Sequence, residues 1–317
     1  MSTPKVGLAL GSGAARGCTH IGIIEVLQEE GIKVSFISGT SIGSIVGAAL
    51  AAGQLEALKE AVLGLDWRKL VYLTFDLKRI RSGLVDGRKV ADFINESIQV
   101  HDFADLDLPF RCVAADLMTG EAVVFSEGDL VSAIRASISI PGMFTPVFQN
   151  ERVMVDGGVV NPVPVDVVRD MGADVVISVD INHGRLEKAK GSMPRNMLDE
   201  TLRKVEEKMG STERTTVIGR MLDRLQQVQP EDLGAARAWL APDPVPNIFD
   251  VLGNSIRIME AQIASTRELA HPSDVLLTPS VGNVEVLAFH KAKEMIAIGR
   301  ETAIAALPRI HAALERG

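Results

Sequence analysis

The sequence predicts an α/β fold built on a mostly parallel central sheet. The apolar run Val6–Leu10 is typical of a buried strand, and the helical spacing of residues 20–30 stops at Gly31, a residue type common just past a helix. A second apolar run at residues 33–37 leads into a small-residue helical run at 44–52. Strands and helices that alternate in this way form parallel sheets with right-handed crossovers.

The later elements follow from the same patterns. Strands are expected at residues 110–117, 121–125, 152–155, 173–179 and 275–278, and helices at residues 56–65, 129–137, 249–269 and 289–315. The turn Met118-Thr119-Gly120 predicts a hairpin between the first two of these strands. A further helix is expected to begin after Pro164, and the last helix to be interrupted near Pro308.

Composition limits the classes of protein that this chain can be. With 317 residues, of which 46% are hydrophobic, the chain can bury a sizeable core. Its formal net charge of −8 argues against a nucleic-acid-binding protein, which usually presents a basic face. We therefore expect no nucleic-acid partner.

The expected location of the chain is the cytoplasm. The two cysteines, Cys18 and Cys112, are too few for a disulfide framework and lack metal-ligand spacing. No signal-peptide pattern precedes the first strand, and no apolar run approaches the ~20 residues that span a bilayer. Basic and aromatic residues mix in residues 67–83, which leaves a peripheral membrane contact open, although we favour a capping subdomain with solvated charges.

The motif Gly39-Thr40-Ser41-Ile42-Gly43 lies between a predicted strand and a predicted helix. A serine at such a turn, with glycines two residues to either side, is the arrangement of a nucleophile elbow. The glycines permit a strained backbone that exposes the hydroxyl above the sheet edge. A simple tight turn is the alternative, and the strand and helix at its two sides favour the nucleophile.

The first strand also runs into a glycine-rich loop, residues 11–17, that has two functional interpretations. A dinucleotide site would need a third glycine where the chain has Arg16, and an acid at the end of the second strand. An oxyanion hole would need backbone N–H groups beside a helix N-terminus and a nucleophile at the next strand, where Ser41 lies. A turn without a ligand is the third alternative.

A base for Ser41 is not identified by spacing alone. His183, His271 and His290 have the chain order of a hydrolase triad, but none lies in a glycine-rich turn. Asp156 follows a strand and precedes two glycines, yet an ordinary aspartate, with a pKa of ~3.9, is a weak base unless burial raises that value.

Three ordered motifs together resemble the patatin-like phospholipase family, with bacterial members related to neuropathy target esterase as the nearest match. The motifs are Gly11-Ser12-Gly13-Ala14-Ala15-Arg16-Gly17, Gly39-Thr40-Ser41-Ile42-Gly43 and Asp156-Gly157-Gly158. Arg135-Ala136-Ser137, Ile140-Pro141-Gly142 and Asn161-Pro162-Val163-Pro164 extend the resemblance.

The resemblance implies a Ser–Asp dyad of Ser41 and Asp156 that works without histidine. It also implies an oxyanion hole from the backbone of the glycine loop, and we expect the loop, the serine and the acid at neighbouring strand ends. The substrate-binding set that it implies is Gly11, Ser12, Gly13, Ala14, Arg16 and Ile42. The family chemistry needs no metal and no organic cofactor.

The implied architecture is a patatin-like three-layer α/β/α fold with a mostly parallel central sheet and a helical insertion. We expect a catalytic core at residues 1–183, a helical insertion or lid at 184–246, and C-terminal helices and a strand at 247–317 that complete the core.

The implied activity is that of a serine acyl hydrolase, an esterase or lysophospholipase that cleaves fatty-acyl esters of (lyso)phospholipids through an acyl-enzyme. The implied partner is thus an acyl-ester lipid substrate. A low-turnover regulatory or lipid- or protein-binding member of the same fold is the first alternative, and a dinucleotide-dependent oxidoreductase the second. Chain length, head group and oligomeric state stay open.

Overall fold

A computed structural model describes residues 3–65, 87–182, 248–281, 284 and 288–317. The chain forms two compact units, one of Met1–Glu187 with Ile256–Gly317 and the other of Lys188–Ser255. The mixed basic and aromatic stretch at 67–83 and the expected insertion at 184–246 lie outside the described residues, so both interpretations stay predictions.

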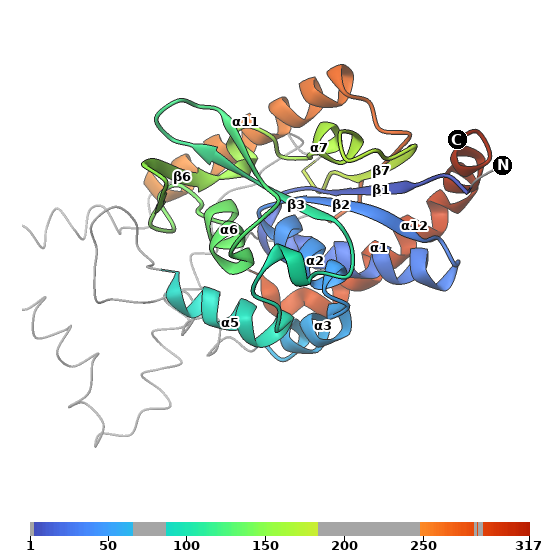
Figure 1. Cartoon of the computed structure of the whole chain (residues 1–317), viewed down its shortest axis with the longest axis horizontal. Helices are drawn as coiled ribbons and strands as arrows, with labels where there is room; N and C mark the ends of the chain where they lie inside the picture. Colours follow the sequence, from blue (N-terminus) through green and yellow to red (C-terminus); the bar gives the residue numbers. More distant parts are fainter. Residues whose placement is uncertain (1–2, 66–86, 183–247, 282–283, 285–287) are drawn as a thin grey trace, which may run out of the picture. The chain divides into compact units, whose positions relative to one another are not determined.

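One sheet organises the first unit (Figure 1). Its described strands are β1 (Val6–Leu10), β2 (Val34–Thr40), β3 (Phe110–Asp116), β4 (Ala122–Phe125), β5 (Val147–Gln149), β6 (Arg152–Asp156), β7 (Val175–Val179) and β8 (Val275–Leu277). The order is β5-β6-β3-β2-β1-β7-β8, with β4 paired to β3. Pairing is parallel from β3 through β2, β1 and β7 to β8. At the other side, β4 and β6 each pair antiparallel with β3, and β5 pairs antiparallel with β6. The sheet is therefore mostly parallel, as predicted.

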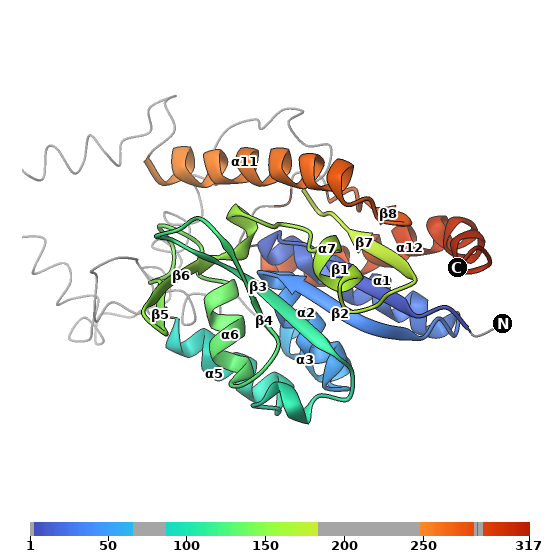
Figure 2. The same cartoon turned by 45° about the horizontal axis from the view of Figure 1, so that its top comes forward.

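Helices cover both faces of this sheet (Figure 2). They are α1 (Cys18–Glu29), α2 (Ile42–Ala51), α3 (Leu55–Leu63), α5 (Arg88–Ile98), α6 (Leu130–Ser137), α7 (Val165–Arg169), α11 (Ile248–Ala270) and α12 (Ala292–Leu314). Side chains alternate along β1, because successive residues of a strand face opposite sides. Leu8 and Leu10 join the core formed with α1, α2 and α12, and Ala9 joins a smaller core with α7 and Ala264 of α11. These layers confirm the predicted α/β/α architecture.

The helices α1 and α12 approach each other closely. A Cβ added at Gly22 of α1 would overlap the carbonyl oxygen of Ile296 in α12, so only glycine permits this separation. Arg300 of α12 also donates to Glu25 (3.0 Å) and Glu29 (2.7 Å) of α1. Backbone proximity and charge thus join the two helices.

Most predicted elements are confirmed with boundaries shifted by a few residues, including the hairpin of β3 and β4. The helix α5 and the short strand β5 were not predicted. The prediction of an interruption near Pro308 is wrong, since α12 continues through that residue. Pro308 removes the N–H that would bond the carbonyl of Ile304, but both residues are exposed, so water can satisfy this carbonyl.

Gly22→Ala is expected to lower the free energy of unfolding by about 2 kcal/mol or more, because α1 and α12 must move apart. This loss exceeds the ~1 kcal/mol that alanine gains over glycine in a helix interior. Urea unfolding measures it.

The matched control is Gly253→Ala in α11, where an added Cβ has no neighbour within 4 Å among the described residues. That variant should gain up to ~1 kcal/mol from helix propensity alone. A Gly22→Ala protein as stable as the wild type would contradict the close-approach argument.

Candidate active site

Ser41 lies at the sharp turn between β2 and α2, as the motif predicts. Its backbone has φ 56° and ψ −125°, a left-handed conformation that a residue with a side chain rarely adopts. A Cβ at Gly43 would overlap the carbonyl oxygen of Leu10, so the helix start is pressed against the end of β1. The Ser41 N–H donates to Ser137 Oγ (2.9 Å), which holds the strained peptide in place.

Asp156 is brought to Ser41 by β6, a strand that runs in the opposite direction to β2. β3 runs parallel to β2, with Val113 beside Thr40, and continues beyond the end of β2. β6 returns antiparallel along this extension and places Asp156 beside Ala114. The expectation that Ser41 and Asp156 follow neighbouring strands is therefore wrong, because β3 lies between β6 and β2. Asp156 nevertheless reaches the same edge of the sheet as Ser41, because β6 runs in the opposite direction to β2.

The two side chains meet in a buried hydrogen bond. Ser41 Oγ donates to Asp156 Oδ2 at 2.6 Å, and the N–H of Gly158 donates to Asp156 Oδ1 at 2.7 Å. Asp156 is only 2% exposed and Ser41 only 4%. Burial raises the pKa of Asp156 to about 6, against the lowering effect of these two hydrogen bonds. The carboxylate is therefore a stronger base than an exposed aspartate and is still ionised at neutral pH.

The glycine loop supplies fewer free N–H groups than the sequence suggested. The N–H of Gly11 donates to Val179 O (3.0 Å) and that of Ser12 to Pro162 O (2.8 Å). We expected the backbone from Gly11 to Ala14 to donate to an oxyanion. With the N–H groups of Gly11 and Ser12 already bonded, the candidate donors are reduced to the N–H groups of Gly13 and Ala14. Ala14, with φ 51°, also has a positive φ, as Ser41 does.

Two buried side chains, Arg16 and His20, hold this loop in shape. Arg16 is buried, donates from Nε to Gly13 O (3.2 Å) and donates from Nη2 to Asn182 Oδ1 (2.8 Å). His20 is fully buried with Nε2 2.9 Å from Gly11 O, and burial lowers its pKa to about 4, so the ring is neutral and donates to that carbonyl. Arg16 therefore holds the loop in place through its bonds to Gly13 O and Asn182.

The sequence analysis missed Asn182 and Glu260, which also contact the loop. Asn182 Nδ2 lies 3.3 Å from Ser12 O, and the hydroxyl of Ser12 donates to Glu260 Oε2 at 3.3 Å. Asn182 follows β7 and Glu260 lies in α11, both far from the motifs. Only the position of Asn182, just past the end of a parallel strand, was a signal that could have found it.

Ile42 begins α2 directly after Ser41. The first N–H groups of a helix have no partner within the helix, and the N-terminus carries a partial positive charge. The ten-residue α2 therefore directs positive potential at the region in front of Ser41 Oγ.

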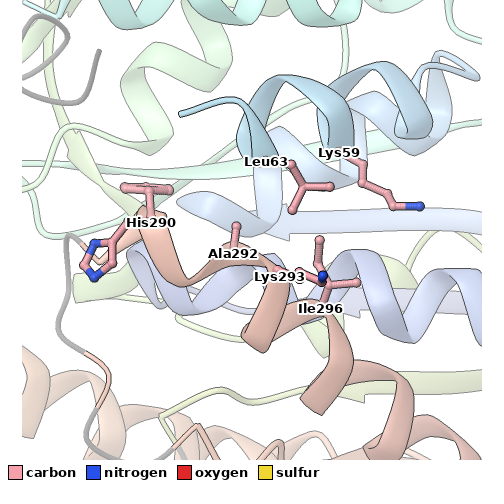
Figure 3. Close-up of a pocket in the computed structure, with 7 residues that line it drawn as sticks. Lys59, Leu63, His290, Ala292, Lys293 and Ile296 are labelled. Atoms are coloured by element: carbon pink, nitrogen blue, oxygen red, sulfur yellow. The ribbon is translucent and has the colours of Figure 1, made fainter. Parts of the chain in front are cut away.

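Other candidate groups lie apart from the dyad. Within the described residues, no histidine is hydrogen-bonded to Ser41 or Asp156, and no set of three His, Cys, Asp or Glu side chains is arranged to hold a metal ion. His183 lies outside the described residues. The cavity in Figure 3, about 510 Å³, is lined by Lys59, Leu63, Phe289, His290, Ala292, Lys293 and Ile296. Of these residues, His290 was a candidate base, and none belongs to the site set that the family resemblance implies. In the part of the chain that the structure describes, no helix is long and apolar enough to cross a bilayer.

Comparison with known protein families and sequences gives consistent matches. A family model described as patatin-like phospholipase matches residues 8–169. An uncharacterized NTE family protein of Mycobacterium tuberculosis is 31% identical over 333 aligned residues, which cover 96% of this chain and 92% of that protein. The human patatin-like phospholipase domain-containing protein 6 is 33% identical over 182 residues, 56% of this chain and 13% of that protein.

A solved structure gives a similar result for the fold. VipD from Legionella pneumophila aligns with a TM-score of 0.51 and 13% sequence identity, covering 97% of this chain and 67% of that one. At so low an identity the likeness concerns the fold alone.

Asp156→Asn is expected to gain stability relative to the wild type as the pH rises. The carboxyl group has a higher pKa in the folded chain, about 6, than its ordinary 3.8, so over this interval the folded state holds a proton that the unfolded state releases. The wild type therefore loses over this interval a contribution to stability that the asparagine variant lacks, and the difference between the two proteins changes with pH. Urea midpoints measured from pH 4 to pH 8 give the difference, and one that stays constant with pH would contradict the raised pKa.

Proposed function

The chain belongs to the patatin-like phospholipase family, and from this premise we propose that it is a serine acyl hydrolase. Its substrates are fatty-acyl esters of phospholipids or lysophospholipids, and Ser41 and Asp156 form the catalytic dyad. The observation that carries the proposal is the buried hydrogen bond of 2.6 Å from Ser41 Oγ to Asp156 Oδ2. The expected cytoplasmic location, with a peripheral contact to lipid, belongs to the same proposal.

Acylation begins with Ser41 Oγ attacking the ester carbonyl carbon. Asp156 Oδ2 accepts the hydroxyl proton as the new C–O bond forms, and the carbonyl oxygen becomes an oxyanion. When the tetrahedral intermediate collapses, the protonated Asp156 gives its proton to the leaving alcohol. The products of this step are a serine ester of the fatty acid and a free alcohol, such as the glycerol part of the lipid.

Deacylation repeats the same proton transfers with water as the nucleophile. Asp156 takes a proton from water, which attacks the acyl-enzyme, and then returns a proton to Ser41 Oγ. The fatty acid leaves and the dyad is regenerated. Because the serine, the acid and water account for every bond and proton, the proposed reaction needs no metal and no organic cofactor.

The negative charge on the substrate oxygen requires donors near Ser41. The N–H groups of Gly13 and Ala14 are proposed as these donors, since the N–H of Gly11 already donates to Val179 O and that of Ser12 to Pro162 O. The N-terminus of α2, which begins at Ile42, adds favourable potential. Arg16 supports the donors indirectly because it bonds to the carbonyl of Gly13.

A fluorophosphonate probe is expected to label Ser41, and Ser41→Ala to prevent that labelling. Ser41→Ala and Asp156→Asn should each reduce ester hydrolysis by about 10³-fold or more, since a nucleophile and its base act as a unit. Mass spectrometry of the labelled peptide and hydrolysis of lysophospholipids, phospholipids and short esters measure these outcomes.

Ser97→Ala provides a matched control, because Ser97 is also buried but its hydroxyl donates to Phe93 O within its own helix, α5. It should keep full labelling. Full hydrolysis by Asp156→Asn would disprove the dyad. A folded wild type that is not labelled, yet binds lipid or a protein, would favour the regulatory alternative.

The labelling rate is expected to fall as the pH drops through about 6, by tenfold per unit below it, because Asp156 must be ionised to accept the serine proton. Asp156→Asn should be slow at every pH and show no such limb. A wild-type acid limb near pH 4 would mean that burial does not raise the pKa of the base.

A further inference from the structure

Glu260 of α11 places a second carboxyl group beside the dyad and the glycine loop. Helix α11 lies with α7 on one face of the sheet (Figure 2), and Ala264, one turn beyond Glu260, is buried in the core on that face. Packing of α11 against the sheet therefore fixes the position from which the Glu260 side chain extends. The mechanism above gives this group no role.

The first set of contacts joins Glu260 to the glycine loop. Glu260 Oε2 accepts from Ser12 Oγ (3.3 Å) and from Asn182 Nδ2 (3.3 Å). Asn182 in turn accepts from Arg16 Nη2 at 2.8 Å, and Arg16 holds Gly13 O. A continuous network thus leads from α11 to the peptide that precedes the proposed oxyanion donors.

A second contact joins Glu260 to the acid turn. A Cβ added at Gly158 would overlap Glu260 Oε1, so the carboxyl group lies directly against the Gly158 backbone. The N–H of Gly158 is the group that donates to Asp156 Oδ1 at 2.7 Å. Glu260 therefore contacts both halves of the site, the loop and the turn that orients the base.

The surroundings of Glu260 favour its neutral form. Glu260 is half-buried, and this partial loss of solvent raises its pKa to about 8. The negative charges of Asp156 and Asp180 act in the same direction, while Ser12 and the positive charge of Arg16 oppose the rise. Both hydrogen bonds from Ser12 and Asn182 reach Oε2, so Oε1 can carry the proton without loss of either bond. Two carboxyl groups thus share the site, with Glu260 protonated and Asp156 ionised at neutral pH.

We propose that Glu260 is a positioning residue of the hydrolase site, which holds the glycine loop and the Asp156 turn to α11 through its contacts with Ser12, Asn182 and Gly158. It performs this role in its neutral form. This inference rests on the proposed function. Ionisation of Glu260 adds a negative charge beside the loop that must stabilise an oxyanion, and repulsion from Asp156 and Asp180 loosens the Glu260 contacts. Ionisation of Glu260 also makes Asp156 more basic. This gain compensates for little of the lost reactivity, because Asp156 is already ionised above pH 6.

The test compares the pH dependence of fluorophosphonate labelling in the wild type, Glu260→Gln and Glu260→Ala. The wild-type rate should fall about tenfold between pH 7 and pH 9, as expected for ionisation of a group with a pKa near 8. Glu260→Gln imitates the neutral acid, so it should label within about threefold of the wild type at pH 7 and show no alkaline fall. Glu260→Ala loses the contacts to the loop and the turn and should be about tenfold slower or more at every pH.

Stability provides a readout that does not depend on activity. An acid with a raised pKa in the folded state destabilises the fold as the pH rises from about 4.5 to about 8. Glu260→Gln should therefore gain stability relative to the wild type over that interval. Glu268→Gln is the matched control on the same helix, because Glu268 bonds to Ser273 away from the site; it should keep the wild-type alkaline fall in labelling.

Two outcomes would overturn the inference while leaving the dyad intact: an unchanged alkaline limb in Glu260→Gln, or Glu260→Gln labelling as slow as Glu260→Ala at pH 7. Labelling of the wild type at no pH would instead disprove the proposed function. In that event stability still tests the state of Glu260. If the difference in stability between Glu260→Gln and the wild type does not change with pH, Glu260 is not neutral in the folded protein.

Discussion

The free energy of burying the Asp156 carboxylate is the constraint on which the site depends. An exposed aspartate, with a pKa of ~3.9, holds a proton too weakly to assist a serine. Burial between β3, η3 (Gly157–Val159) and the Ser41 turn raises that pKa to about 6, while the bonds from Gly158 and Ser41 limit the rise. The group is therefore ionised at neutral pH and is a better base than aspartate in water.

The surrounding structure follows from the need to keep this pair fixed. Ser41 has a strained backbone that Gly43 and the hydroxyl of Ser137 make possible. In the glycine loop, the N–H groups of Gly11 and Ser12 and the carbonyl of Gly13 have hydrogen-bond partners, so the proposed oxyanion donors are the N–H groups of Gly13 and Ala14. Donors fixed in advance need no rearrangement when charge develops, which is where catalytic sites gain most of their advantage.

Much of the fold was predictable because its elements are encoded locally. The apolar runs of β1 and β2 and the glycines around Ser41 specify a strand, a turn and a helix within a few residues. The predictions that were missed or wrong concern elements whose structure depends on pairing with other strands or on exposure to solvent. Three-residue β5 exists only through pairing with β6, and α12 passes through Pro308 because the carbonyl freed there faces solvent.

The sequence by itself determined the family resemblance, the elbow and the two residues proposed as the dyad, because these are short motifs with their own backbone requirements. Tertiary structure alone decided that β6 runs backwards to bring Asp156 to Ser41, that Gly11 and Ser12 are already bonded, and that Glu260 lies against the loop. Glu260 and Ser12 are 248 residues apart in the chain. Burial and charge act through space, so the protonation of a carboxyl group depends on neighbours that no local pattern identifies.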